Sequence, residues 1–381
     1  MLIKNCCDTI KTFEKNFPQQ KKLDVGKVLV IVRVFRLGEL FAGAGGLAWG
    51  ALHAENHYGK IVHAWANDYD AFTCDTYRKN ICPEEFDSVV CCDVRNLDFS
   101  TLGAIDALAF GFPCNDFSIV GKKAGLNGKY GLLYQYAVEA LKYFQPDWFI
   151  AENVRGLAST NKGSAQQKIL SGFRDAGYQI FPHLYKFEEY GIPQTRHRII
   201  IVGIRNDLGK TFSPPAPFKG MNISSKNALE NPPIAFDAFN HEKTKQSSRV
   251  VERLKFIKPG QNAFNADIPS EFQLHVKSAT FSSIYRRLDP DKPAYTVTGS
   301  GGGGTHVYHY TEPRALTNRE RARLQTFPDN FVFMGSKENV RRQIGMAVPC
   351  KGAQIIFESI LKTFADVDYD SVPCNIVFNS K

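Results

Sequence analysis

The sequence predicts an α/β fold with a largely parallel sheet, because short apolar runs alternate with helical patterns between Leu37 and Arg205. Glycine or polar residues follow most of these runs, which is where such sheets bind ligands. The expected strands are Leu37–Phe41, Ile61–Ala66, Ser88–Cys92, Ile105–Phe110, Trp148–Ala151 and Ile199–Ile204. The expected helices between them include Tyr69–Asn80, Leu133–Phe144 and Gln166–Ala176.

The ends of the first three strands indicate a site for a cofactor that contains adenosine. The first strand ends in a glycine-rich turn, Phe41-Ala-Gly43-Ala44-Gly45-Gly46, which lets the backbone approach a ligand closely. The second ends in Asp68-Tyr69, an acid for ribose hydroxyls beside a ring that can stack on adenine. The third ends in Asp93-Val94, where the acid can face the adenine amine. Each feature alone is also typical of a tight turn or a helix cap.

The fourth strand leads into Gly111-Phe-Pro113-Cys114, which places a cysteine on a turn that Pro113 stiffens. A thiolate in that position could act as an exposed nucleophile. A single cysteine is more often a small buried residue, but its place beside the expected cofactor site favours the nucleophile.

Two further strand ends carry charged residues. Glu152 closes the run Trp148–Ala151, and a carboxyl group in apolar surroundings can serve as a proton donor. Arg196 and Arg198 precede Ile199–Ile204 and are expected on one strand face, because side chains alternate. Two guanidinium groups there could grip a carbonyl oxygen or a phosphate. The alternatives are a helix cap or ion pair for Glu152, and surface charges for the arginines.

Composition changes after Arg205, and we expect a second, smaller, loop-rich domain over residues 206–300. The glycine run Gly299–Gly304 is interpreted as a flexible joint. Thr317 and Glu320 predict a capping box for a helix through Gln325, and a last helix is expected over Lys351–Phe364. Residues 206–350 hold 20 basic and 13 acidic side chains, a net charge of +7, whereas residues 37–205 hold 16 and 18. This asymmetry suits a polyanionic partner for the second module, although a solvated lysine-rich surface is the alternative.

Composition excludes several other classes of protein. No apolar run reaches the roughly 18 to 20 residues that span a bilayer, so we expect an intracellular protein with no membrane association. The nine cysteines lack metal-binding spacing, so neither a disulfide framework nor a metal site is expected. Residues 1–36 carry no chemical signature and are interpreted as an N-terminal extension.

Taken in order, these motifs resemble the DNA (cytosine-5)-methyltransferases, chiefly the bacterial enzymes of restriction–modification systems. The resemblance covers residues 37–364 and continues through Thr296-Val297, Arg319-Glu-Arg-Ala-Arg323-Leu-Gln and Gln343-Ile-Gly345-Met346-Ala347-Val348-Pro349. It implies a Rossmann-like S-adenosylmethionine-dependent methyltransferase sheet over residues 37–205. It also implies a target recognition domain over residues 206–300, and C-terminal motifs with a helix that returns to the catalytic domain over residues 301–381.

The resemblance also implies a role for each matching residue. Cys114 would add to C6 of a cytosine flipped out of double-stranded DNA, Glu152 would protonate N3, and Arg198 with Arg196 would clamp the base. S-adenosylmethionine would be the methyl donor, and no metal is required. The implied enzyme is a bacterial cytoplasmic monomer with a possible cognate restriction endonuclease. The implied cofactor-binding residues are Phe41, Gly43, Ala44, Gly45, Asp68, Tyr69, Asp93, Val94, Pro113, Leu133, Ala347 and Val348.

The chain departs from the family pattern at three positions. Glu39 stands where the family often has Asp, Asn115 where it often has Gln, and Met346 where it usually has Asn. Met346 removes an amide near the cofactor's methionine moiety, which bears on cofactor affinity. A transfer RNA cytosine methyltransferase, an inactive DNA-binding homologue and a nicotinamide-dependent dehydrogenase are the competing interpretations. The long segment 206–300 argues against the first, intact Cys114, Glu152 and Arg198 against the second, and Pro113-Cys114 with the C-terminal motifs against the third.

Overall fold

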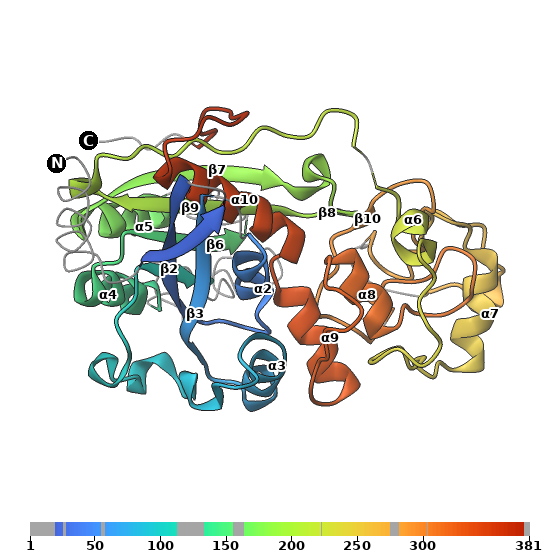
Figure 1. Ribbon diagram of the computed structural model, residues 1–381. Helices are drawn as coiled ribbons and strands as arrows, with labels where there is room; N and C mark the ends of the chain where they lie inside the picture. The colour runs from blue at the N-terminus through green and yellow to red at the C-terminus, as the bar shows by residue number, and fades with distance from the viewer. Residues whose placement is uncertain are drawn as a thin grey trace, which may run out of the picture.

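The protein consists of a large lobe built on a twisted sheet and a smaller lobe with few regular elements (Figure 1). The computed structural model describes residues 20–25, 28–54, 58–112, 133–154, 164–221, 223–274, 282–302 and 304–376. The predicted α/β fold is confirmed.

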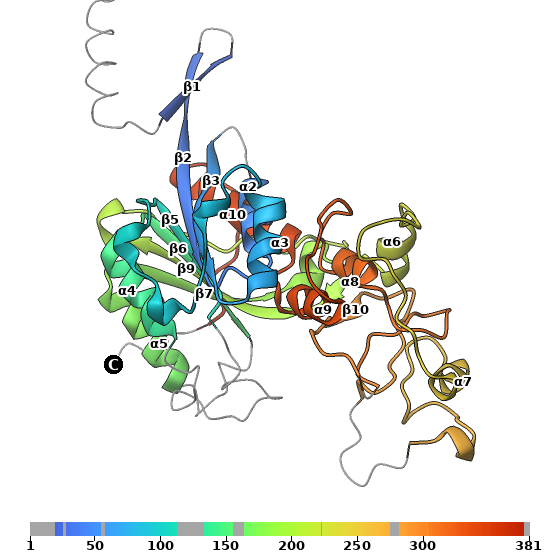
Figure 2. The same cartoon turned by 90° about the horizontal axis from the view of Figure 1, so that it is seen from below.

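The main sheet has the strand order β4-β3-β2-β5-β6-β9-β7, and β1 pairs with β2 outside this path. The pairings from β4 to β6 are parallel, whereas β9 runs antiparallel to both β6 and β7. The antiparallel β1–β2 hairpin extends away from the rest of the sheet (Figure 2). The strands are β1 (Gln20–Val25), β2 (Val28–Leu40), β3 (Gly59–Asp68), β4 (Val89–Cys91), β5 (Ala107–Phe110), β6 (Trp148–Val154), β7 (Tyr178–Lys186) and β9 (His197–Arg205).

Helices cover both faces of the sheet, because the central strands are apolar on both sides. Trp148 and Ile150 of β6 belong to the core under α2 (Gly46–Leu52) and α10 (Cys350–Phe364). Phe149 and Ala151 point to the opposite core, under α4 (Tyr134–Phe144) and α5 (Ser164–Asp175). The helix α3 (Ala71–Ile81) packs near β4, the strand at one edge of the sheet.

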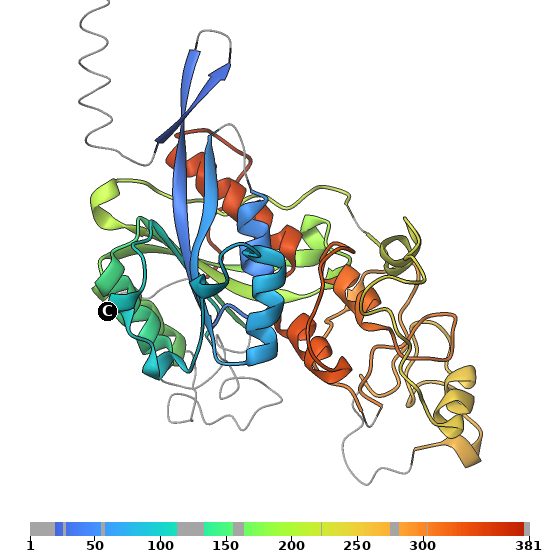
Figure 3. The ribbon, with the colours of Figure 1, turned by 60° about the horizontal axis from the view of Figure 1, so that its bottom comes forward.

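The C-terminal helix α10 returns to the large lobe and packs against α2 (Figure 3). Its residues Phe357 and Phe364 are buried against Trp148 and Phe35 of the sheet. The stretch Lys337–Phe364 is long and apolar enough to cross a membrane by length and composition alone. However, 67% of its most apolar 18-residue segment is buried inside the protein. The stretch is also interrupted between α9 and α10, so it is better explained as core helices.

The smaller lobe contains α6 (Ser225–Glu230), α7 (Ser248–Phe256), α8 (Asn318–Leu324) and α9 (Lys337–Met346). A small core around Leu254, Ile257, Tyr285 and Tyr308 holds its outer part together. The predicted capping box at the start of α8 is present, since Thr317 accepts from the backbone of Glu320 and Glu320 accepts in return. Short 3-10 helices lie at Phe86–Ser88, Val94–Asn96, Phe99–Thr101, Phe187–Tyr190, Asn206–Leu208 and Ser270–Phe272.

Buried amides join the two lobes. The short strand β8 (Gln194–Thr195) pairs in parallel with β10 (Ala294–Tyr295). The Gln194 amide donates to Leu324 O and Gln325 Oε1, each at 3.0 Å, and accepts from Val297 N at 2.8 Å. Gln325 in turn donates to the carbonyls of Ile344 and Ala347. These hydrogen bonds therefore connect Gln194 of β8 with the segment that leads from α8 to α10.

Several elements differ from the sequence-based expectations. The strand β2 begins at Val28, so the sheet starts within the segment 1–36 that we interpreted as an extension. The strand β7 was not predicted, because Pro182 interrupts its pattern; the structure places it at the edge of the sheet, where proline is tolerated. The helix α9 was also missed. At the start of the joint expected over Gly299–Gly304, Gly299 packs on α9, since a Cβ there would lie 3.0 Å from the Cα of Arg342.

Candidate active site and cofactor cavity

A cavity of about 270 Å³ lies at the carboxyl ends of β2, β3 and β4 and is closed from the other side by the end of α9. Such a position is the usual ligand site of a parallel α/β sheet. Most of the predicted cofactor residues line this cavity: Phe41, Gly43, Ala44, Asp68, Tyr69, Asp93, Val94, Leu133, Ala347 and Val348.

The glycine-rich turn has the conformation that its sequence requires. Gly43 and Gly45 have φ angles of 58° and 88°, in the left-handed region that favours glycine. A Cβ at Gly46 would lie 2.6 Å from the carbonyl oxygen of Val348, so the turn and the C-terminal segment touch through their backbones. Gly45 does not line the cavity, because its open side faces Ile81 and Tyr77.

Asp68 and Asp93, at the ends of β3 and β4, accept hydrogen bonds from backbone N–H groups of other residues that line the cavity. Asp68 accepts from the backbone N–H groups of Gly43 and Asp70, each at 3.0 Å. Burial nevertheless raises the pKa of Asp68. Asp93 begins a 3-10 helix by accepting from the backbone of Arg95, whose guanidinium also pairs with it at 2.5 Å. Tyr69 also lines the cavity and is 69% exposed.

The helix α9 forms the wall opposite the glycine turn. Arg342 pairs with Asp70 at 2.7 Å across the cavity mouth, and both residues line the cavity. Behind them, Thr76 donates to the amide oxygen of Gln343 at 2.7 Å. Met346 also lines the cavity and is 65% exposed, so the departure from the family pattern falls within the site.

Glu152 and Arg198 form an ion pair at the edge of the cavity, with 2.7 Å between Oε1 and Nε. The antiparallel register sets Val154 opposite Arg198, so Glu152 is the diagonal neighbour on the same face. The other carboxylate oxygen lies 3.3 Å from the position that a Cβ at Gly111 would take. The pair therefore meets the backbone that leads from β5 toward Cys114.

Arg196 does not share the strand face of Arg198, contrary to our expectation. Its backbone lies between β8 and β9, where its N–H donates to Gln194 O at 2.9 Å, so the alternation of side chains is interrupted. The guanidinium is fully buried and donates to the carbonyls of Val297 at 3.2 Å and Gly345 at 3.1 Å. It joins β8 to the smaller lobe and lies outside the lining of the cavity.

The nucleophile predicted at Cys114 and the cofactor residue predicted at Pro113 lie outside the described residues. The approach to them is described. Asn153 donates from its amide to the carbonyl of Phe112 at 3.3 Å and is 2% exposed. Asn153 thus holds the chain just before Pro113, a role that the sequence analysis did not assign.

Sequence reasoning also missed the part of α9 that faces the cavity. Arg342 lies four residues before Met346, which is one helical turn, so recognition of a helix there would have placed both on one face. Asp70 and Thr73 form an N-cap with a recognisable spacing, since Asp70 accepts from Thr73 N at 3.0 Å.

The lining fits an adenosine-containing cofactor with a charged tail. It combines two acids at neighbouring strand ends, an exposed aromatic ring, apolar walls and an arginine at the mouth. Within the described part of the chain, no group of three His, Cys, Asp or Glu residues could hold a metal ion. The fold and the cavity indicate an enzyme of the α/β class that binds a nucleoside cofactor.

Comparison with known proteins identifies the family. The model of the C-5 cytosine-specific DNA methylases matches residues 35–362. Type II methyltransferase M.BbvI of Brevibacillus brevis is 56% identical over 360 residues, which cover 91% of this chain and 96% of that protein. Type II methyltransferase M.NgoFVII of Neisseria gonorrhoeae is 40% identical over 343 residues, which cover 87% of this chain and 88% of that protein. The chain therefore belongs to the C-5 cytosine-specific DNA methylase family and is a DNA (cytosine-5)-methyltransferase of the restriction–modification type.

Solved structures share the fold. A crystal structure described as a DNA modification methyltransferase from an E. coli prophage superimposes with a TM-score of 0.67 at 24% identity, covering 86% of this chain and 99% of that one. The S. pombe Dnmt2 methyltransferase gives a TM-score of 0.52 at 16% identity, over 87% and 98% of the two chains.

Proposed function

We propose that this enzyme methylates C5 of a cytosine within a short specified sequence of double-stranded DNA, through a covalent bond between Cys114 and C6. S-adenosylmethionine is the proposed donor. The modification would protect bacterial cytoplasmic DNA from a partner restriction endonuclease, as the names of the type II relatives suggest. The enzyme would act as a monomer.

The observation that carries this proposal is the Glu152–Arg198 pair beside Gly111. C5 of cytosine is a weak nucleophile, so the ring must be activated before it can attack a methyl group. Addition of the Cys114 thiolate to C6, with proton transfer from Glu152 to N3, would make C5 electron-rich. After C5 is methylated, loss of its proton and departure of Cys114 would restore the aromatic ring.

Each remaining part of the cavity has a proposed task. S-adenosylmethionine, when bound, supplies an electrophilic methyl group. Asp68, Tyr69 and Asp93 would hold its adenosine part, and the backbone of the turn at Gly43 would lie close to the bound cofactor. Arg198 would orient both Glu152 and the base, and the base would have to leave the duplex to reach them.

We assign DNA recognition to residues 206–300 and catalysis to residues 37–205 with the returning segment 301–381. The charge supports this division, because residues 206–300 hold 13 basic and 9 acidic side chains, a net charge of +4, whereas residues 37–205 hold 16 and 18, a net charge of −2. Basic side chains contact phosphates, and other side chains would read the edges of the bases.

The test uses methyl-labelled S-adenosylmethionine, unmethylated double-stranded DNA and transfer RNA as the control substrate. We expect the wild type to label DNA only, and Cys114→Ser to label nothing. Cys91→Ser is the matched control, because Cys91 is an exposed cysteine of the same lobe, and it should retain activity. Bisulfite sequencing of the product would then locate the methylated site.

A duplex with 5-fluorocytosine at that site tests the covalent step, since fluorine at C5 blocks the proton loss that releases the enzyme. The wild type should remain attached to this duplex on a denaturing gel, and Cys114→Ser should not. Full activity of Cys114→Ser, or label on transfer RNA alone, would refute the proposal. For the protective role, plasmid from expressing cells should resist an endonuclease that reads the located site.

A further inference from the structure

Arg321 and Arg341 are two buried arginines of the smaller lobe. Arg321 of α8 is 1% exposed and donates to the carbonyl of Thr298 at 3.3 Å and to Nδ1 of His306 at 3.4 Å. Arg341 of α9 is 9% exposed, and its Nε is buried without a hydrogen-bond partner. Among the residues that the structure describes, no carboxylate forms an ion pair with either guanidinium.

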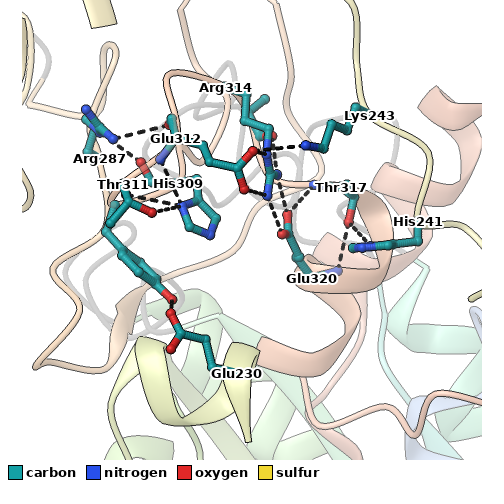
Figure 4. A network of polar contacts seen from close by, with 12 residues as sticks. Glu230, His241, Lys243, Arg287, His309, Thr311, Glu312, Arg314, Thr317 and Glu320 are labelled. Carbon is teal, nitrogen blue, oxygen red and sulfur yellow. Dashed lines mark hydrogen bonds and ion pairs between the residues drawn. The ribbon is translucent and has the colours of Figure 1, made fainter. Parts of the chain in front are cut away.

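The neighbouring Arg314 shows how this lobe neutralises an arginine elsewhere (Figure 4). Its guanidinium lies between Glu312 at 2.8 Å and Glu320 at 2.7 Å, and Lys243 also pairs with Glu312. Those two acids are therefore engaged already. A buried charge without such a partner is costly, which makes the contrast with Arg321 and Arg341 informative.

The positive charges of this cluster also shift the pKa values within it. Burial and, after it, the charge of Arg341 together lower the pKa of Arg321 to about 10. Burial also lowers the pKa of His306 to about 4, with contributions from both arginines. His306 is therefore neutral near pH 7 and can accept from Arg321, which remains charged.

The segment Thr298–Gly302 lies directly over these cations. A Cβ at Gly301 would overlap the guanidinium of Arg341 and lie 2.8 Å from His306, so glycine is needed for this contact. Thr298 and Ser300 are exposed, and their hydroxyl oxygens are 2.6 Å apart. Exposed hydroxyl groups above buried positive charge form a surface suited to an oxyanion.

We propose that Arg341 and the segment Thr298–Gly302 bind one phosphodiester group of the DNA backbone, with Arg321 adding positive charge behind them. The proposal rests on double-stranded DNA being the substrate. A phosphate would supply the counter-charge that the protein lacks, and a guanidinium matches its geometry. Such a contact would fix the position of the duplex and carry no sequence information.

The first test measures DNA affinity by fluorescence anisotropy at several salt concentrations. The duplexes are one with the methylated site and one of unrelated sequence. Arg341→Gln should reduce the slope of log affinity against log salt concentration by about 0.9, which is the contribution of one phosphate contact. It should lower the affinity for both duplexes by the same factor. Arg341→Lys should keep the slope, because it retains the charge. The matched control is Arg174→Gln, which removes an exposed arginine from α5 of the large lobe.

The second test identifies the phosphate that is bound. A series of duplexes, each with one neutral methylphosphonate, should reveal a phosphate whose neutralisation weakens the wild type but has no further effect on Arg341→Gln. An unchanged salt slope in Arg341→Gln, or additive losses at every phosphate, would overturn the proposal. DNA binding without methylation by the wild type would contradict the proposed function alone, and failure to bind DNA would contradict both.

Discussion

Alanine at Gly50 is expected to destabilise the protein, although alanine normally favours a helix. Gly50 lies inside α2, where a Cβ would be 2.6 Å from the Cβ of Ala353, 2.6 Å from Cys350 O and 2.7 Å from Gln354 N. Two of these atoms belong to the backbone of α10 and cannot rotate away. Carbon atoms prefer about 3.5–4.0 Å, so α10 would have to move by about 1 Å.

The magnitude follows from two opposing effects. Replacement of a helical glycine by alanine gains up to about 1 kcal/mol. Overpacking of a close helix contact costs about 1–3 kcal/mol. We therefore expect a net loss of up to about 2 kcal/mol. Val348 lies two residues before α10 and lines the cofactor cavity, so weaker binding of S-adenosylmethionine should accompany the loss.

The control is the same substitution in α5. A Cβ at Gly172 meets its nearest neighbour, Val138 Cγ2, at an ordinary 3.4 Å, so Gly172→Ala should stabilise by about 0.5–1 kcal/mol. Urea unfolding would give both stabilities, and titration calorimetry would give cofactor affinity. The reasoning is refuted if the two variants shift stability in the same direction, or if Gly50→Ala unfolds and binds as the wild type does.

Three further predictions concern single side chains. Burial raises the pKa of Glu39 from 4.5 to about 8, so the native state keeps a proton that the unfolded chain loses above about pH 4.5. The free energy of unfolding should therefore fall as pH rises from about 4.5 to about 8. Urea midpoints at several pH values should show this fall in the wild type and not in Glu39→Gln. Met346→Asn should tighten S-adenosylmethionine binding about two- to tenfold by calorimetry, because it adds a hydrogen-bonding amide to the cavity; unchanged affinity would contradict this. Gln325→Leu should cost about 1–3 kcal/mol in urea unfolding, because it removes the buried hydrogen bonds that the Gln325 amide makes with Gln194, Ile344 and Ala347; a wild-type midpoint would contradict this.

Local patterns were sufficient for the elements that carry most of the cavity. The ends of β2, β3 and β4 could be predicted because each joins an apolar run to a glycine or an acid. The cap of α8 could be predicted because Thr317 and Glu320 have the spacing of a capping box. Residues such as Asp68 and Tyr69 lie within a few positions of those signals.

Non-local contacts decided what the sequence analysis missed. The strand β7 contains Pro182, and only its place at the sheet edge makes that residue acceptable. Arg196 was assigned by alternation, but the break between β8 and β9 turns it to carbonyls about 100 and 150 positions later in the chain. Arg342 became part of the site only because α9 lies beside α3, where it meets Asp70.

The sequence by itself determined the α/β class, the order of the motifs and the acids and glycines at the strand ends, since these depend on residues close together in the chain. Tertiary structure alone decided that α9 closes the cofactor cavity and that Arg321 and Arg341 are buried together. The physical reason is that burial and charge pairing depend on segments far apart in sequence, whose contacts no local pattern encodes.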